Sequence, residues 1–368
     1  MILRIPDYFE QFHCIADKCK DSCCIGWEID IDEETKDYYL QQKGEIKRKF
    51  EQYMYITEEG EYSLELMEDG KCPFLTEKGL CQLCMELGEE ALSEVCTEYP
   101  RFSLEYGNVL QKCLSLSCEE AGRILFEKDD VVNIVDRHMD WDDPKEEETE
   151  EFIEFLEKVQ NRALVMLQNR EEPLKLRLQR FYEYLSYVAE QLAQEEGNLS
   201  DNFEENKICD TVQTEYRYVD FVERFSVFEE MEVLGMEWEE EKKNLLNFYS
   251  EENYESYLKA YVGSTDYKEV YYEKLLVYFF FRYFMNSVYD FNVVRYGKLA
   301  IVFTLVIRDM NAMRYHKQGG VFKKEDMIDD VRVFSKEVEH SEENVELAGD
   351  AILFDEVYEW KRLEKQIC

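Results

Sequence analysis

The sequence predicts a mainly α-helical protein whose N-terminal part is a cysteine-rich α+β segment with short hairpins. Ten of the twelve cysteines lie between residues 14 and 118 of the 368. From about residue 143 onward, apolar residues instead recur at helical spacing. A hydrophobic fraction of 45% is enough for a substantial core. We therefore expect a cysteine-rich domain over residues 1–130 and a helical domain over residues 143–368.

Short strands are expected in the cysteine-rich segment. Residues 27–31 and 62–67 alternate apolar and polar side chains, as half-buried strands do. Residues 102–106 and 109–116 are separated by Gly107-Asn108. Because such a pair favours a tight turn, the two runs predict a hairpin.

The remainder is expected to be helical. Its helices are predicted over residues 144–167, 173–192, 215–234, 238–249, 267–288, 293–315, 324–339 and 342–365. The polar stretch 197–210 is the best candidate for a linker. The aromatic stripe over residues 271–284 is typical of a helix that faces a core.

The net charge of the chain and its expected compartment limit the molecules that it can bind. A net charge of -40 repels phosphate backbones and anionic lipids, so we expect no nucleic acid and no membrane partner. The start of the chain has no basic leader followed by a long apolar core. The most apolar run, residues 275–281, is too short for a membrane span. We therefore expect a soluble, cytoplasmic protein, whose reduced thiols favour metal binding over disulfides.

The cysteines occur in four groups. They are Cys14-x4-Cys19-x3-Cys23-Cys24, then Cys72 with Cys81-x2-Cys84, then Cys96, and finally Cys113-x4-Cys118. Thiolates bind soft or borderline metals, and four of them complete a zinc site or a cubane cluster. A structural zinc site and buried, inert thiols are the alternatives. Cys209 and Cys368 are expected to be bystanders.

The adjacent pair Cys23-Cys24 restricts the geometry. Side chains of neighbouring residues diverge by about 100° in a helix and point to opposite faces of a strand. Both thiols reach one metal centre only from an irregular loop. A simpler interpretation gives one thiol to a cluster and the other to a second site or to the core.

Other catalytic patterns are sparse. A glycine-rich nucleotide loop at a strand–helix junction is absent from the sequence, which argues against a Rossmann-type fold. Glu339-His340, on a predicted helix, is a candidate pair for handling a proton. The alternative for both residues is an ordinary place in the helix.

Several motifs together resemble flagellin lysine-N-methylases and, more distantly, small cysteine-rich zinc- or iron-chelating proteins. In order they are Cys14…Cys19…Cys23-Cys24-Ile-Gly-Trp27, Cys72-Pro-Phe-Leu75, Gly79-Leu-Cys81, Leu87-Gly-Glu89, Cys96-x2-Tyr-Pro-Arg101 and Ser-Leu-Ser-Cys118. The match covers roughly residues 7–126, and the helical part resembles the family more loosely. The chain has Glu119 where the family usually has proline, and Cys84 and Cys113 are additional.

The resemblance implies methyl transfer from S-adenosylmethionine to lysine side chains of flagellin or a similar surface protein. It also implies a [4Fe–4S] cluster bound by the N-terminal cysteines. The positions that match the family are Cys14, Cys19, Cys23, Cys24, Cys72, Cys81, Cys96 and Cys118. Eight thiols exceed the four that one cluster needs, so a second metal or a structural role for some stays open.

For the cofactor, Arg101 is a candidate partner of the carboxylate, and Trp27 or Tyr99 is a candidate wall for the sulfonium through cation–π contact. The alternative for Trp27, which the residue type favours, is an ordinary place in the core. The alternative function is a non-catalytic adaptor, stapled by zinc or a cluster, that binds a basic protein through its acidic helices.

Overall fold

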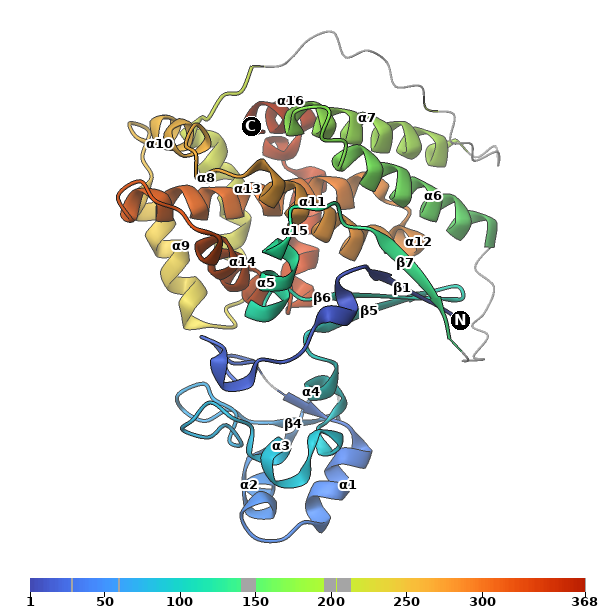
Figure 1. The fold of residues 1–368 in the computed structure, drawn as a ribbon, viewed down its shortest axis with the longest axis vertical. Coiled ribbons are helices and arrows are strands. Elements are labelled where there is room, and N and C mark those ends of the chain that lie inside the picture. Colours follow the sequence, from blue (N-terminus) through green and yellow to red (C-terminus); the bar gives the residue numbers. More distant parts are fainter. Residues whose placement is uncertain (28, 59, 140–149, 195–202, 204–212, 368) are drawn as a thin grey trace.

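The computed structural model describes residues 1–27, 29–58, 60–139, 150–194, 203 and 213–367. Figure 1 shows a large helical body above a smaller lobe, with a sheet at the side of the body. The mainly helical prediction is confirmed, and so is the small sheet region in the N-terminal third. The predicted linker 197–210 lies outside the described residues except for Phe203, as do Cys209 and Cys368.

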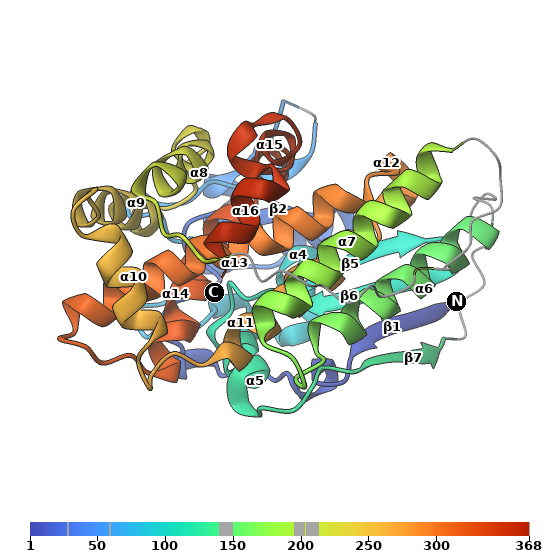
Figure 2. The ribbon, with the colours of Figure 1, turned by 90° about the horizontal axis from the view of Figure 1, so that it is seen from above.

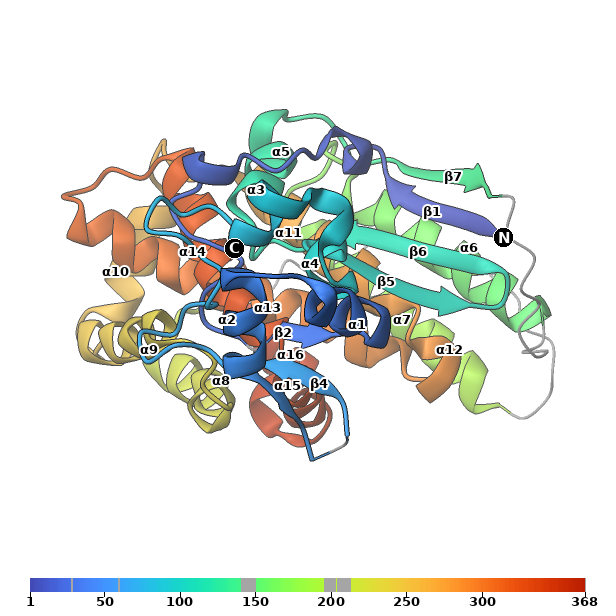
Figure 3. The same ribbon diagram turned by 90° about the horizontal axis from the view of Figure 1, so that it is seen from below.

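A four-stranded sheet borders the helical body. It contains β1 (Ile2–Pro6), β5 (Arg101–Tyr106), β6 (Val109–Leu114) and β7 (Ile134–His138), in the order β5-β6-β1-β7. Figure 3 shows these strands side by side. Strands β5 and β6 form the predicted hairpin, in which Tyr106 pairs with Val109 across the two-residue turn. Strands β1 and β7 were not predicted, because neither shows a clear alternation of apolar and polar residues.

The small lobe, residues 24–98, has its own sheet and core. Strands β2 (Ile29–Ile31), β4 (Tyr62–Leu64) and β3 (Met54–Ile56) pair in that order. Strands β2 and β4 lie within the two predicted runs, whereas β3 was not predicted. The lobe also contains α1 (Glu33–Gln41), α2 (Glu45–Tyr53), α3 (Gln82–Leu87) and α4 (Glu94–Glu98). Among the described residues of the lobe, nine buried hydrophobic side chains form this core, which is separate from that of the body.

The helical body is built from the remaining helices. They are α5 (Glu119–Glu127), α6 (Glu150–Leu167), α7 (Leu174–Ala193), α8 (Tyr218–Glu230), α9 (Met236–Phe248), α10 (Tyr254–Val262), α11 (Glu269–Phe284), α12 (Ser287–Asp290), α13 (Val293–Lys317), α14 (Lys324–Val338), α15 (Glu342–Phe354) and α16 (Trp360–Gln366). The apolar periodicity therefore located most of them correctly.

Three departures from the predicted helices have local causes. Helix α10 was missed because it is short and rich in tyrosine. The run predicted over 267–288 divides into α11 and α12. The run over 342–365 is broken between α15 and α16, where Asp355 and Glu359 adopt extended conformations. Between them Tyr358 is buried, and its hydroxyl donates to the Arg224 carbonyl at 2.8 Å.

Helix α13 lies at the centre of the body (Figure 2). It is in contact with α7, α10, α11, α14 and α15, and most of its residues are buried. Helices α7 and α13 approach closely at Gly297, where an added Cβ would lie 2.3 Å from a methyl carbon of Leu185. A side chain there would push the two helices apart.

The sheet and the helices share one hydrophobic core. Tyr106, Val109 and Leu114 of the hairpin belong to the same buried cluster as the residues of α11 and α13. The side chain of Gln111 donates to the Phe281 carbonyl at 2.8 Å. The hairpin thus packs with the helical body, whereas the small lobe has a separate core. The domain boundary predicted after residue 130 stays a prediction.

The most apolar stretch of the sequence, residues 275–281, lies inside α11 and is buried. This confirms the interpretation of the aromatic stripe as core. Across the described ranges, no helix is both long enough and apolar enough to cross a membrane.

A buried ion pair offers a test of the helical core. Glu273 on α11 is 1% exposed, and its carboxylate lies 2.6 Å from Arg177 and 2.7 Å from Arg170. Replacing Glu273 removes a counter-charge from the buried Arg177, which keeps its contact with Glu269, and from the partly exposed Arg170. We expect Glu273→Gln to lower the free energy of unfolding by about 3–5 kcal/mol in urea denaturation.

The matched control is Glu255→Gln, since Glu255 pairs with Lys259 at a site where both side chains are 59% exposed. Its effect should stay below about 0.5 kcal/mol. Equal losses for the two variants would contradict a central role for the buried pair.

Candidate functional site

The connection between α14 and α15 forms a sharp corner beside the sheet. Helix α14 ends at Val338 and is capped by Glu339, whose backbone N–H still donates to the Ser335 carbonyl at 3.0 Å. Ser341 caps α15, because its hydroxyl accepts from the Asn344 N–H at 3.1 Å. His340 is left between the two helices. The pair proposed from the sequence for handling a proton therefore sits at this corner.

Glu339 is a fully buried carboxylate with several partners. It accepts hydrogen bonds from the hydroxyls of Tyr278 and Tyr283, each at 3.1 Å, and it lies 2.9 Å from Nε of Arg282. Burial raises the pKa of Glu339, while the Arg282 guanidinium opposes this shift. Since the donors and the cation are all on α11, they attach the corner firmly to that helix.

His340 points toward the loop that follows β6. Its Nε2 lies 2.8 Å from the hydroxyl of Ser117 and 3.1 Å from that of Ser115. The imidazole stacks on Trp27, with ring centroids 4.8 Å apart and planes 14° from parallel, and Phe102 lies 5.1 Å away. Burial lowers the pKa of His340 to about 3. The ring is therefore neutral at physiological pH.

Two of the three residues predicted to contact the cofactor meet at this corner. The rings of Trp27 and Tyr99 are 5.6 Å apart, and the Tyr99 hydroxyl lies 3.1 Å from that of Ser117. Arg101 instead lies over the ring of Phe12, at 5.3 Å, and donates weakly to the Thr97 carbonyl. Its assignment to the cofactor stays a prediction.

Lys336, on α14, faces the aromatic group formed by Trp27, Tyr99 and His340. The ammonium nitrogen of Lys336 lies 4.9 Å from the centre of the Trp27 ring. Lys336 and Arg332 each contact the Asp21 carboxylate at 2.7 Å. Burial raises the pKa of Asp21, but the two cations outweigh it and hold that pKa below its usual range. These contacts fix the cysteine-bearing loop 19–24 to the helical body.

The predicted metal ligands lie in and beside the small lobe. Cys72 is buried, and Cys24, Cys81 and Cys96 pack against the same core. Cys14 and Cys23 are exposed, whereas Cys19 and Cys118 are half-buried. Contact with the Cys23 thiol lowers the pKa of Cys24 to about 7, against the effect of burial.

The donor set suits a thiolate-bound metal or cluster, because both need several nearby thiolates and few other groups. As the side chains are placed, however, the described residues contain no group of three or more His, Cys, Asp and Glu that could hold a metal ion. Binding would therefore require the thiols to turn toward a common point. Which of the eight cysteines bind metal stays a prediction.

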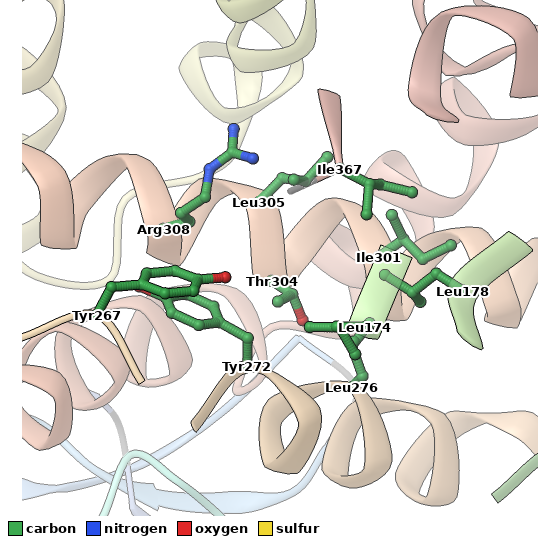
Figure 4. Close-up of a pocket in the computed structure, with 10 residues that line it drawn as sticks. All are labelled: Leu174, Leu178, Tyr267, Tyr272, Leu276, Ile301, Thr304, Leu305, Arg308 and Ile367. Carbon is green, nitrogen blue, oxygen red and sulfur yellow. The ribbon is translucent and has the colours of Figure 1, made fainter. Parts of the chain in front are cut away.

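Two cavities of the body lie away from the aromatic group at Trp27. One, shown in Figure 4, lies between α7, α11 and α13 and is lined by residues that include Leu174, Tyr272 and Arg308. Its volume of about 20 Å³ has room for about one water. A larger depression of about 500 Å³, lined by Arg217, Lys361 and Arg362 among others, is open to the surface. Neither includes the residues around Trp27 and His340.

Several residues at the corner were not found from the sequence. Arg282, Tyr278 and Tyr283 fell within the stretch interpreted as core. Asp21 and Lys336 are ordinary charged residues in the sequence, and nothing marked them as partners. The Ser-Leu-Ser-Cys motif was noticed for its cysteine, whereas the structure gives the two serine hydroxyls to His340.

Fold and site together define a helical protein whose buried polar corner lies beside a cysteine-rich lobe. The sequence profile of the FliB lysine N-methylase C-terminal domain matches residues 160–365. The chain therefore belongs to this family. The matched residues belong to the helical body. The sequence motifs resembled the family more loosely there than in residues 7–126.

Curated relatives agree with this assignment. A lysine-N-methylase of Salmonella typhimurium is 36% identical over 131 residues, which are 34% of this chain and 32% of the relative. The lysine-N-methylase of Salmonella choleraesuis matches to the same extent. The flagellar biosynthetic protein FliU of Salmonella muenchen is also 36% identical over 131 residues, 77% of its length. The match thus spans about a third of the length of the two methylases. No solved structure matches the chain significantly.

The pKa of His340 leads to a prediction about stability. An unfolded histidine has a pKa near 6.5, whereas the folded value is about 3. The unfolded chain therefore binds the proton first, and stability falls as the pH drops from about 6.5 toward 3. Between pH 7 and 4.5 we expect wild type to lose roughly 2 kcal/mol more than His340→Gln in urea unfolding.

The control is His138→Gln, because His138 is exposed at the end of β7. That variant should follow the wild-type pH profile. A His340→Gln protein with the wild-type pH dependence would show that His340 is accessible to protons in the folded state.

Proposed function

We propose that this chain transfers a methyl group from S-adenosylmethionine to lysine side chains of flagellin or a similar surface protein. The observation that carries the proposal is membership of the FliB lysine N-methylase family across the helical body. The printed name of the FliU relative, a flagellar biosynthetic protein, supports flagellin as the substrate. A cytoplasmic location fits thiols that must stay reduced to bind metal.

Methyl transfer to a neutral amine depends little on general acid–base catalysis. A neutral lysine amine attacks the methyl carbon, the new C–N bond forms, and the C–S bond breaks to leave a neutral thioether. The positive charge moves from sulfur to nitrogen, while the proton that the lysine gave up beforehand has gone to solvent. An enzyme must therefore align the two groups and favour the neutral amine.

The corner at Trp27 has properties that suit this task. Aromatic faces attract a sulfonium cation, and Trp27 and Tyr99 supply two such faces 5.6 Å apart. The neutral ring of His340, stacked on Trp27, adds no repelling charge. Lys336 lies over Trp27, so a sulfonium on that face of the ring would take the place of its ammonium. We propose that the cofactor binds beside this aromatic group.

We further propose that a [4Fe–4S] cluster is bound by cysteines drawn from the eight N-terminal positions that match the family. When bound, such a cluster would either anchor the amino and carboxylate groups of the cofactor or hold the cysteine-rich segment together. Methyl transfer itself needs no cluster. The reduced, partly buried thiols of the small lobe and the neighbouring loops are the ligands available for it.

The activity is tested with protein purified without oxygen, flagellin, and S-adenosylmethionine labelled in its methyl group. We expect the label in lysine side chains, with a mass increase of one methyl per modification. Trp27→Leu, which removes the aromatic face, should raise KM for the cofactor by roughly 3- to 10-fold. Trp27→Phe is the matched control and should retain most of the affinity.

Absence of transfer by metal-loaded protein would favour a non-catalytic adaptor that binds a basic partner. An equal KM for Trp27→Leu and wild type would place the cofactor elsewhere.

The metal is tested by analysis of iron, acid-labile sulfide and zinc in anaerobically purified protein. We expect iron and sulfide in equal amounts, with broad visible absorption that bleaches on reduction. Zinc without sulfide would contradict the cluster and leave a structural zinc protein.

A further inference from the structure

Strand β5 forms one end of the four-stranded sheet, because β6 is its only neighbour in the strand order. Figure 3 shows it beyond β6, at the opposite end of the sheet from β7. The main chain of an end strand has hydrogen-bonding groups on one side that no other strand of the sheet uses. Strand β5 also begins shortly after Tyr99 of the candidate site. Its outer edge therefore starts beside the aromatic group.

Hydrogen bonds at both ends of the hairpin show which residues of β5 face outward. The pair that closes the two-residue turn bonds across the hairpin. At the other end, the Ser115 N–H donates to the Pro100 carbonyl at 2.6 Å. Since main-chain groups alternate in direction along a strand, the even-numbered residues of β5 bond to β6. The residues whose main chain points away from β6 are Arg101, Ser103 and Glu105.

This outer edge is open at Ser103. The residue is exposed, and across the described part of the chain its main chain makes no hydrogen bond with another element. The carbonyl of Glu105 is occupied instead, because it accepts from the hydroxyl of Tyr289 on α12. The accessible part of the edge therefore runs from Ser103 toward Tyr99.

The two ends of the sheet differ in their protection. Sheets commonly guard an end strand with charged side chains, proline, a bulge or a covering segment. Strand β7, at the opposite end, has Asp136 paired with Arg4 at 2.9 Å. Between Arg101 and Glu105, strand β5 contains no charged residue, no proline and no bulge. The centre of β5 is therefore suited to pairing with a further strand.

A strand added at this edge would bring a side chain to the candidate site. Residues directly opposite each other in a sheet have their side chains on the same face. The ring of Phe102 lies 5.1 Å from that of His340, which stacks on Trp27. The side chain opposite Phe102 would thus point to the aromatic group where the cofactor is proposed to bind.

The charges favour a lysine-bearing segment as the occupant. The chain has a net charge of -40, and the exposed Glu105 lies on the edge strand itself. These charges attract a basic segment. Close to the aromatic group, however, the ammonium of Lys336 lies 4.9 Å from the centre of the Trp27 ring. A like charge this near favours the neutral form of an arriving amine, which is the form that methyl transfer requires.

We propose that the outer edge of β5 binds an extended, lysine-bearing segment of the protein substrate as an additional strand, with the target lysine opposite Phe102. The proposal rests on the proposed methyl transfer and extends it to the way in which the substrate is held. Main-chain hydrogen bonds to Ser103 supply affinity that is independent of sequence, and the aromatic group selects the lysine.

The first test is residue-resolved hydrogen–deuterium exchange of the full-length protein, with and without unmethylated flagellin monomer. In the free protein the Ser103 N–H should exchange fast, because it points to solvent, whereas the Leu104 N–H is bonded to β6 and should exchange slowly. Saturating flagellin should slow the exchange of Ser103 by roughly 10-fold or more and leave Leu104 unchanged.

The second test is Ser103→Pro, which removes the outward N–H and keeps the hydrogen bonds to β6. We expect KM for flagellin to rise roughly 3- to 10-fold, with KM for S-adenosylmethionine unchanged. Ser103→Ala is the matched control, since it keeps the N–H, and it should behave as wild type. His138→Pro places proline at an outward position of β7 and reports any general effect of a proline at a sheet edge. If Ser103→Pro does not fold, the exchange of the wild-type protein decides the question.

Unchanged exchange at Ser103 in protein that binds and methylates flagellin would overturn this proposal and leave the methyl transfer intact. An unaltered KM for flagellin in folded Ser103→Pro protein would overturn it as well. Protection of Ser103 by flagellin without any methyl transfer would support the docking edge and contradict the proposed enzyme. Absence of both binding and transfer would contradict both proposals.

Discussion

The burial of α13 is the constraint on which the helical body depends. This helix of 25 residues is surrounded by other helices along most of its length. Charged residues within it therefore need partners in the core, and Asp309 finds them in Arg224 and Arg308. Such groups are costly to leave unpaired. They fix the positions of the helices around α13 more strictly than apolar packing alone.

Two of the helices that pack on α13 create the candidate site. Helix α11 brings Tyr278, Arg282 and Tyr283 to one place, and the end of α14 delivers Glu339 to them. A buried carboxylate persists there because a cation and two hydroxyls replace its hydration. The corner then holds His340 against Trp27, a residue that precedes it by more than three hundred positions. The functional geometry is thus a consequence of how the helical core is packed.

This dependence explains what the sequence could and could not predict. Periodicity located α7, α13 and the β5–β6 hairpin, because each is encoded by its own residues. The motifs singled out Trp27 and Tyr99, and the structure places them together. The side chains that these residues contact could not be predicted from the sequence, since the stacking of His340 on Trp27 depends on long-range packing. Lys336 and Asp21 looked like ordinary surface charges, and only the fold pairs them.

The small lobe and the helical body differ in the size of their hydrophobic cores. The body is stabilised by an extensive apolar core, and it carries the part of the chain that defines the family. The lobe has few buried residues, yet most of the cysteines lie in or beside it. Contacts of Asp21 with Arg332 and Lys336 join the loop that carries Cys19, Cys23 and Cys24 to the body. A shift of that loop therefore acts directly on Trp27, because Lys336 contacts both Asp21 and the indole ring.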